Sequence, residues 1–280
     1  MRHKKIITIN TNSFNRIKDT NIQKFLKVKI FSGHIIIFRN SSIVKKIIKE
    51  VRNIVENFFC YNIFNYSSSF EKKSLNIRFL NIQKEVKKSL LIKKLFNLFL
   101  QTLDFSIHDT YIDRICIRYI PKKNDKIVGN LKHTKAHRDT WASNILEQIN
   151  WWFPAIDILS NNTLFISPKY FNQKIINNSS LWSFEKYLKN KINLDSTPTI
   201  IGKVDINDKV VIKLRVGDIV CFSGHHLHGS NSGIHDRLNL ETRTVTKTDS
   251  YNYAIPKMLD GNFEKKKKEW FRNCFTNRPL

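Results

Sequence analysis

A change of hydrophobic pattern near Tyr111 limits the folds open to this chain more than any other feature of its sequence. Before this point the apolar residues follow a helical period, and after it they fall into short segments separated by turns. In the first segment Ile115, Ile117 and Tyr119 recur at every second position, as on a strand with one buried face. Several short strands joined by turns favour a double-sheet barrel of the jelly-roll or cupin kind. The expected strands cover residues 114–120, 148–156, 163–167, 210–216, 219–223 and 237–246.

Helices are expected ahead of the barrel. Ile43, Ile47 and Val51 begin an apolar series at helical spacing, and the run Asn40-Ser41-Ser42 before it can cap a helix. A second helix is expected over residues 82–103. Such basic amphipathic helices can lie on a membrane, but packing on the side of a sheet is the commoner outcome. Residues 28–39 predict a strand, a turn and a second strand.

These patterns predict one domain that is mainly β with flanking helices, in the α+β class. It is expected to cover residues 28–257, with helical support over about 40–103 and a double-stranded β-helix core over about 111–250. A basic leader, 1–27, and a basic C-terminal tail, 258–280, complete the expected organisation.

Composition narrows the class of protein. The hydrophobic content of 41% in 280 residues is enough for a substantial core. No apolar run approaches the roughly 18 residues that a membrane span needs, and none of signal-peptide length follows the basic start. The four cysteines have no paired spacing, which argues against a zinc knuckle or a disulfide framework. A soluble, cytoplasmic protein is expected.

The net charge of +25 and the pI near 10.0 leave two interpretations open. A polyanionic partner is one: nucleic acid, an anionic membrane or a phosphate-bearing substrate. The other is composition, because lysine, asparagine and isoleucine are abundant together throughout the chain, as an AT-rich coding sequence would give. We favour composition.

His137 and Asp139 are the first candidate ligands of a metal. On an extended strand, residues two apart project to the same face, so both side chains can reach one ion. Two imidazoles and one carboxylate hold three positions on Fe(II) and leave three open for oxygen chemistry. The third ligand is sought among His225, His226 and His228. We prefer His228, because Gly224 turns the preceding strand and small residues follow the histidine; His226 is the reserve.

Arg237 and Arg243 are the candidates for binding a co-substrate. They lie six positions apart, so both fall on one face of the last strand. A guanidinium clamps a carboxylate through two hydrogen bonds, which lysine cannot reproduce. One of the two would hold the distal carboxylate of 2-oxoglutarate, and we prefer Arg237 because it is nearer to His228.

Together these residues resemble the phytanoyl-CoA dioxygenase-like family of Fe(II)/2-oxoglutarate oxygenases. The resemblance covers about residues 30–250. The chain departs from the family in a slightly short interval of nine positions between His228 and Arg237, which would be eleven from His226. It also has Pro168-Lys169-Tyr170-Phe171 where the family has a Pro-Gly-Ser-His turn. The matching pieces are residues 32–40, 114–118, 137–141, 148–152, 217–222 and 228–230, with Arg237.

The resemblance implies iron on His137, Asp139 and His228, and 2-oxoglutarate on Arg237. It further implies an enzyme that consumes O2, releases succinate and CO2, and hydroxylates a small or carrier-linked metabolite. Trp141, Trp151 and Trp152 could line the substrate pocket, with core packing as the alternative. No specific nucleic acid is expected, because the lysines form no single groove and no aromatic stacking platform is recognisable. Two rivals remain: a nucleic-acid-modifying oxygenase, and a non-catalytic or isomerase cupin-type protein. The pattern does not predict an oligomeric state.

Overall fold

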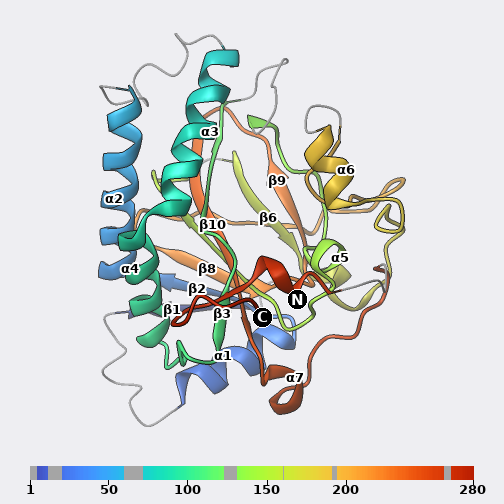
Figure 1. Ribbon diagram of the computed structural model, residues 1–280. Coiled ribbons are helices and arrows are strands. Elements are labelled where there is room, and N and C mark those ends of the chain that lie inside the picture. Colours follow the sequence, from blue (N-terminus) through green and yellow to red (C-terminus); the bar gives the residue numbers. More distant parts are fainter. Residues whose placement is uncertain are drawn as a thin grey trace.

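Two β-sheets pack face to face at the centre of the computed structural model (Figure 1). The structure describes residues 5–11, 21–59, 72–122, 131–159, 161–190, 194–261 and 266–280. Parts of the expected leader (1–4 and 12–20) and of the expected tail (262–265) lie outside these residues.

The large sheet holds most of the strands. Its order is β1, β2, β8, β5, β10, β3 and β11, and β4 also pairs with β10. All its pairs are antiparallel except β1 with β2. The bounds are β1 Ile6–Asn10, β2 Ile35–Arg39, β3 Thr110–Ile112, β4 Cys116–Ile120, β5 Ile149–Pro154, β8 Ile219–Ser223, β10 Arg237–Thr246 and β11 Arg272–Asn273.

The small sheet has the order β7 (Val210–Val211), β6 (Thr163–Ser167) and β9 (Leu227–Asn231), and His137 adds a one-residue bridge to β9. From β4 onward the chain alternates between the two sheets. β4, β5, β8 and β10 belong to the large sheet, and the His137 bridge, the pair β6 and β7, and β9 follow them in turn in the small sheet. This winding is that of a double-stranded β-helix, so the predicted fold class is confirmed.

Helices cover the outer face of the large sheet (Figure 1). Trp151 of β5 points into this layer, where its ring meets Phe96, Phe99 and Phe105 edge-on at 5.9–6.1 Å. Each such aromatic pair contributes about 0.5–1.5 kcal/mol beyond burial. Trp152 points the other way, into the core between the sheets. The helices of this layer are α1 Ile22–Phe31, α2 Ser42–Phe59, α3 Lys72–Lys88 and α4 Leu90–Gln101.

Five further short helical segments with bounds lie outside this layer in the part of the chain that the structure describes. They are α5 Thr140–Ser143, η5 Pro168–Asn172, α6 Phe184–Lys189, α7 Asp249–Asn252 and η6 Lys268–Trp270. Among the helices that the structure describes, none is long and apolar enough to cross a membrane.

Several expected elements are confirmed. β6, β8 and β10 have the predicted bounds, and β4 and β5 lie inside theirs. The helix predicted after Asn40 is α2, and the Ser41 hydroxyl caps it by accepting a hydrogen bond from the Val44 amide at 3.3 Å.

Other elements differ from expectation. The first strand predicted within 28–39 is wrong: Val28–Phe31 ends α1, whose Leu26 and Ile30 are fully buried at helical spacing. The single helix expected over 82–103 is two helices, because the Ser89 hydroxyl caps a new one by accepting from the Ile92 amide. The strand expected over 210–216 is reduced to Val210–Val211.

Both ends of the chain contribute to the large sheet. β1 comes from the expected leader and pairs with β2. β11 comes from the expected tail and pairs with β3. The described parts of leader and tail therefore belong to the packed domain.

α1 is tied to the end of β10 by a buried ion pair. The Lys27 ammonium lies 2.6 Å from Asp249 of α7, donates to the Thr246 hydroxyl at 2.9 Å, and sits 5.0 Å from the centre of the Phe105 ring. Both charged side chains are 1% exposed. Because solvent does not screen the Lys27–Asp249 attraction, this pair helps to hold α1 against the large sheet.

Candidate metal centre

β9 carries His228, and the bridge places His137 directly beside it. The backbone N–H of each residue donates to the carbonyl of the other, both at 2.9 Å. Residues opposite one another in such a pair present their side chains on one face. The two imidazole rings accordingly lie 4.4 Å apart, centre to centre.

Gly229 favours this pairing. A Cβ atom there would lie 3.1 Å from the Cα of Ala136, a tight contact that would push the backbone before His137 a few tenths of an ångström away from β9. Gly229, which was expected to leave room beside a metal, therefore allows two backbone segments to lie close together.

Each histidine has its tautomer set by a backbone carbonyl. Nδ1 of His137 lies 2.8 Å from the Lys135 carbonyl, and Nδ1 of His228 lies 2.9 Å from the His226 carbonyl. A carbonyl only accepts, so in each neutral ring Nδ1 carries the proton and Nε2 keeps its lone pair. Burial lowers the pKa of His228 to about 4, and the neighbouring His137 acts in the same direction. His228 is thus neutral at pH 7, as a metal ligand must be.

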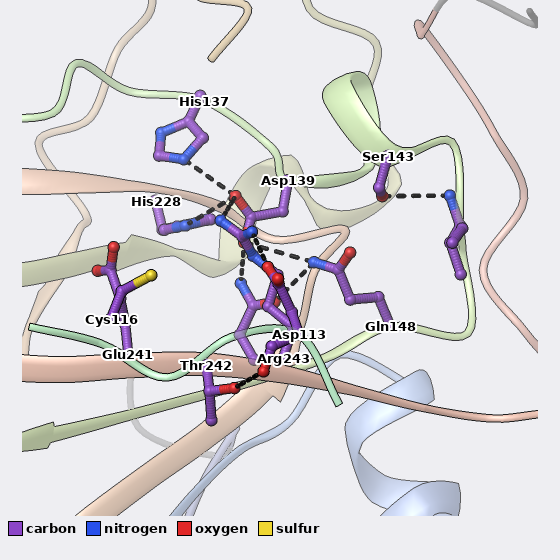
Figure 2. Close-up of polar contacts among 12 residues, drawn as sticks. Asp113, Cys116, His137, Asp139, Ser143, Gln148, His228, Glu241, Thr242 and Arg243 are labelled. Carbon is purple, nitrogen blue, oxygen red and sulfur yellow. Dashed lines mark hydrogen bonds and ion pairs between the residues drawn. The ribbon is translucent and has the colours of Figure 1, made fainter. Parts of the chain in front are cut away.

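Both Nε2 atoms point toward the carboxylate of Asp139 (Figure 2). The Oδ1 atom lies 3.2 Å from Nε2 of His137 and 3.9 Å from Nε2 of His228. One ligand atom from each of the three residues lies within 4.8 Å of the others, and all three residues are buried. Adjacent ligands bound to one ion at about 2.1 Å lie roughly 3 Å apart. Two lone pairs and a carboxylate oxygen repel one another unless a cation lies among them, so the donor set fits a metal ion.

Asp139 reaches this position from a helix and not from the extended strand expected over His137–Asp139. It is the first residue of the turn into α5, with φ −66° and ψ −29°. The strand pairing is confined to His137. Arg138 between them points away, as expected, and donates to the carbonyls of His225, Tyr170 and Gln173 at 2.6–2.7 Å.

The second carboxylate oxygen of Asp139 is held by the protein. Its Oδ2 atom accepts from Arg243 Nε at 2.9 Å and from Asn150 Nδ2 at 2.7 Å, with Gln148 Nε2 at 3.4 Å. Burial opposes ionisation of Asp139, but the Arg243 charge outweighs it and holds the pKa of this carboxyl well below its usual range. The carboxylate is therefore charged, and Oδ1 is turned toward the histidines, although Arg243 Nη2 also lies 3.4 Å from Oδ1.

Arg243 is fixed between two carboxylates. Its Nη1 donates to Asp113 Oδ2 at 2.8 Å, opposite its contact with Asp139 (Figure 2). No role was predicted from the sequence for Asp113, Gln148 or Asn150. The one available signal was alternation, since Gln148, Asn150 and Trp152 share a face of a strand that is otherwise apolar.

The other two histidines lie outside the cluster. Both ring nitrogens of His226 lie 3.2 Å from backbone carbonyls, those of Ser223 and Gly33. His225 packs its ring edge-on against Phe171 at 5.5 Å. Among the described residues, only His137, Asp139 and His228 form a group that could hold a metal ion.

Arg237 is a buried guanidinium with unused hydrogen-bond donors. It is 2% exposed, and its Nη2 donates to the Ser230 hydroxyl at 2.9 Å. Nε and Nη1 have no partner within the described chain. Burial lowers the pKa of Arg237 to about 9, and the nearby Arg118 acts in the same direction. A buried cation with free donors is costly unless an anion meets it, so this site fits a carboxylate ligand.

One cavity of about 420 Å³ joins these features. His137, Asp139 and His228 line it, and so do Arg237 and Arg243. Of the three tryptophans considered from the sequence, Trp151 and Trp152 border the cavity while packing in the cores on opposite faces of β5. Trp141 does not line it and donates to Asp260 at 2.7 Å.

No protein-family model matches the chain, and no curated protein matches its sequence. Solved structures do match. EvdO2 from Micromonospora carbonacea var. aurantiaca, complexed with 2-oxoglutarate, is 12% identical with a TM-score of 0.41. The match covers 64% of this chain and 66% of EvdO2, just under two thirds of that protein's length.

Two further solved structures match with similarly low sequence identity and TM-score. The apo form of ThoJ, a non-heme monooxygenase, is 10% identical with a TM-score of 0.49, and the match covers 80% of this chain and 77% of ThoJ. The epimerase SnoN, in complex with Fe3+, alpha ketoglutarate and nogalamycin RO, is 12% identical with a TM-score of 0.35, over 67% of this chain and 72% of SnoN. At these identities and TM-scores the matches do not establish chemistry, which has to come from the side chains of this chain.

Proposed function

We propose that this chain is an Fe(II)- and 2-oxoglutarate-dependent dioxygenase of the phytanoyl-CoA dioxygenase-like kind, which hydroxylates a small or carrier-linked substrate. The observation that carries the proposal is the convergence of two Nε2 lone pairs and one carboxylate oxygen on a single point. His137, Asp139 and His228 would hold the iron there. Two imidazoles and one carboxylate leave three positions open, which distinguishes such a centre from a closed structural site.

Arg237 would bind the distal carboxylate of 2-oxoglutarate. Its two unpartnered nitrogens provide the donors, and Ser230 orients the guanidinium by accepting from the third. When bound, iron and 2-oxoglutarate supply the oxidising chemistry, which consumes O2, releases succinate and CO2 and ends in hydroxylation of a C–H bond.

The remaining side chains position these groups and exclude water. Arg243 and Asn150 hold Asp139 so that one oxygen faces the metal position. Trp152, Leu164 and Phe222 form an apolar part of the cavity wall. A dry, shaped cavity of this kind confines the reaction to the bound substrate.

The direct test is optical. Under anaerobic conditions we expect Fe(II) and 2-oxoglutarate together to produce a weak visible charge-transfer band with the wild-type protein. His137→Ala should abolish the band, whereas His235→Ala, which removes an exposed histidine outside the cavity, should retain it. Admission of O2 should then yield succinate in the same two proteins that show the band. A folded wild-type protein that binds iron but shows neither band nor succinate would refute the proposal.

A further inference from the structure

Cationic side chains outnumber carboxylates on the wall of the cavity. The wall has six cations and four carboxylates, a difference of two. Three of the carboxylates are already paired: Asp113 and Asp139 with Arg243, and Glu241 with Arg118 at 3.0 Å. The cations are Lys87, Arg114, Arg118, Arg237, Arg243 and Arg272.

Three of the cations stand at the mouth without partners. Lys87, Arg114 and Arg272 are exposed, and their side chains make no hydrogen bond or ion pair with any part of the chain that the structure describes. They come from α3, from the link between β3 and β4, and from β11. β11 pairs with β3 so that Arg272 lies opposite Ile112, two residues before Arg114. Lys87 lies four residues after Gln83, whose side chain accepts from the Ile117 amide of β4, so this part of α3 stands beside the strand that follows Arg114.

The proposed cofactors do not neutralise this excess. Fe(II) carries two positive charges and the 2-oxoglutarate dianion two negative ones, so together they leave the charge of the wall unchanged. Glu269 is the one wall carboxylate without a cationic partner among the described residues, against three free cations at the mouth. A cleft lined by an excess of one sign focuses its field on a ligand of the other sign.

Aromatic rings also line the cavity. Phe184 and Tyr187 come from α6 and Trp270 from η6, and all three line the cavity. The ring centres of Phe184 and Trp270 lie 5.1 Å apart, inclined at 61°. Rings arranged in this way offer contact surface to an apolar or planar body.

We propose that the mouth binds the anionic end of the substrate, a carboxylate or a phosphate ester, through Lys87, Arg114 and Arg272. The aromatic residues contact the body of the substrate, and the carbon to be oxidised lies deeper, toward the metal cluster. The orientation of the substrate in this assignment rests on the proposed function. The excess of positive charge on the cavity wall does not depend on that function.

Small probe molecules distinguish a phosphate ester from a carboxylate as the anionic group of the substrate. Phenyl phosphate and benzoate carry the two anions on the same ring, and benzyl alcohol is their neutral counterpart. Binding is measured by calorimetry under anaerobic conditions with Fe(II) and saturating 2-oxoglutarate, so that Arg237 is already occupied. We expect at least one anionic probe to bind roughly tenfold or more tightly than benzyl alcohol. The stronger of the two anions identifies the class of substrate.

A charge-matched pair of variants tests the location. In Lys87→Gln/Arg114→Gln/Arg272→Gln we expect the anion affinity to fall by roughly tenfold or more. The control Lys46→Gln/Lys49→Gln/Lys94→Gln removes three exposed cations from α2 and α4, which do not line the cavity, and should bind as the wild type does. Equal losses in the two variants would show an effect of net charge and overturn the proposal, as would equal binding of the neutral and anionic probes. A wild-type protein without the optical band that still binds the anion at the mouth would overturn the proposed function alone.

Discussion

At the scale of the residue, one backbone carbonyl decides what each histidine of the cluster can do. With Nδ1–H bound to a carbonyl two residues earlier in the chain, the imidazole of His137 or His228 can offer only Nε2. Metal-binding histidines commonly have their second nitrogen fixed in this way, and the contact sets the orientation of the ring. His226 differs because both its nitrogens already face carbonyls.

The first prediction follows from this difference. His228→Ala should abolish Fe(II) binding, as should His137→Ala and Asp139→Ala, because each removes a ligand atom of the cluster. His225→Ala and His226→Ala should bind iron, with lower thermal stability from the lost packing. Anaerobic titration of Fe(II) into each folded variant provides the measurement. Iron binding that survives His228→Ala and is lost in His226→Ala would reassign the third ligand.

The second prediction separates the two arginines. Arg237→Ala should weaken 2-oxoglutarate binding by about 2–5 kcal/mol, the scale of losing one partner of a buried charge pair. Arg243→Ala should act mainly on the metal, because it releases Asp139 and leaves Asp113 without its cation. The exposed Arg215 serves as the control through Arg215→Ala.

Two titrations of the same variants check this division, one of iron and one of 2-oxoglutarate at saturating iron. We expect the larger loss in the 2-oxoglutarate titration for Arg237→Ala and in the iron titration for Arg243→Ala. The reverse order would make Arg243 the carboxylate clamp.

At the scale of the element, the ion pair between α1 and α7 gives the third prediction. Lys27→Met should lower the free energy of unfolding by about 3–5 kcal/mol, because it leaves the Asp249 carboxylate buried without a partner. The double variant Lys27→Met/Asp249→Leu should recover most of this loss. Chemical denaturation measures both, with Lys24→Met on the exposed face of the same helix as control. A double variant no more stable than Lys27→Met would show that the two charges are not coupled.

Elements with a strong local pattern could be predicted from the sequence, and the others could not. The apolar runs of β6 and β8, the alternation at the start of β10 and the helical period of α2 are visible in the chain itself. β9 has the sequence Leu-His-Gly-Ser-Asn, without apolar alternation, and its conformation comes from pairing with β6. His137 has strand pairing at one position only, so no local pattern could have revealed it.

The residues of the candidate site also divide into those that the sequence predicts and those that it does not. The sequence pointed to His137, Asp139, His228, Arg237 and Arg243, whose residue types and order carry the pattern. Asp113 acts through a contact with Arg243, 130 positions later in the chain, and Asn150 and Ser230 act through contacts with Asp139 and Arg237 that depend on how the strands are placed. Only the register of β10 against β5 brings Arg243 opposite Asn150, and a period along one strand does not contain that information.

At the scale of the whole molecule, the cluster joins parts of the chain that are distant in sequence. Of its supports, Asn150 and Arg243 belong to the large sheet and Asp113 follows β3 of that sheet, whereas His228 and the His137 bridge belong to the small one. A metal that binds only the folded state therefore stabilises the barrel as a unit. At a free concentration of about 100 times Kd the stabilisation is about 2.7 kcal/mol, which raises Tm by roughly 5–10 °C for a chain of this size.

The fourth prediction is this rise in Tm upon anaerobic addition of Fe(II), and its reversal by a chelator. His137→Ala should show no rise, and His235→Ala should show the full rise. A rise of the same size in His137→Ala would place the stabilising ion elsewhere on the protein.

The pairing of His137 with His228 makes the backbone a reporter of the centre. Two hydrogen bonds between His137 and His228, with a third from the Ser230 amide to the Thr134 carbonyl, join the two segments here, and the first two use the amides of the residues whose rings would hold the ion. Local opening of so short a bridge costs less than global unfolding, so these two amide protons should exchange with solvent deuterium ahead of those in β5 or β10. An ion held by both rings would tie the two strands together through their side chains and slow exchange at these two positions first. The occupancy of the centre could thus be followed residue by residue, without turnover of a substrate.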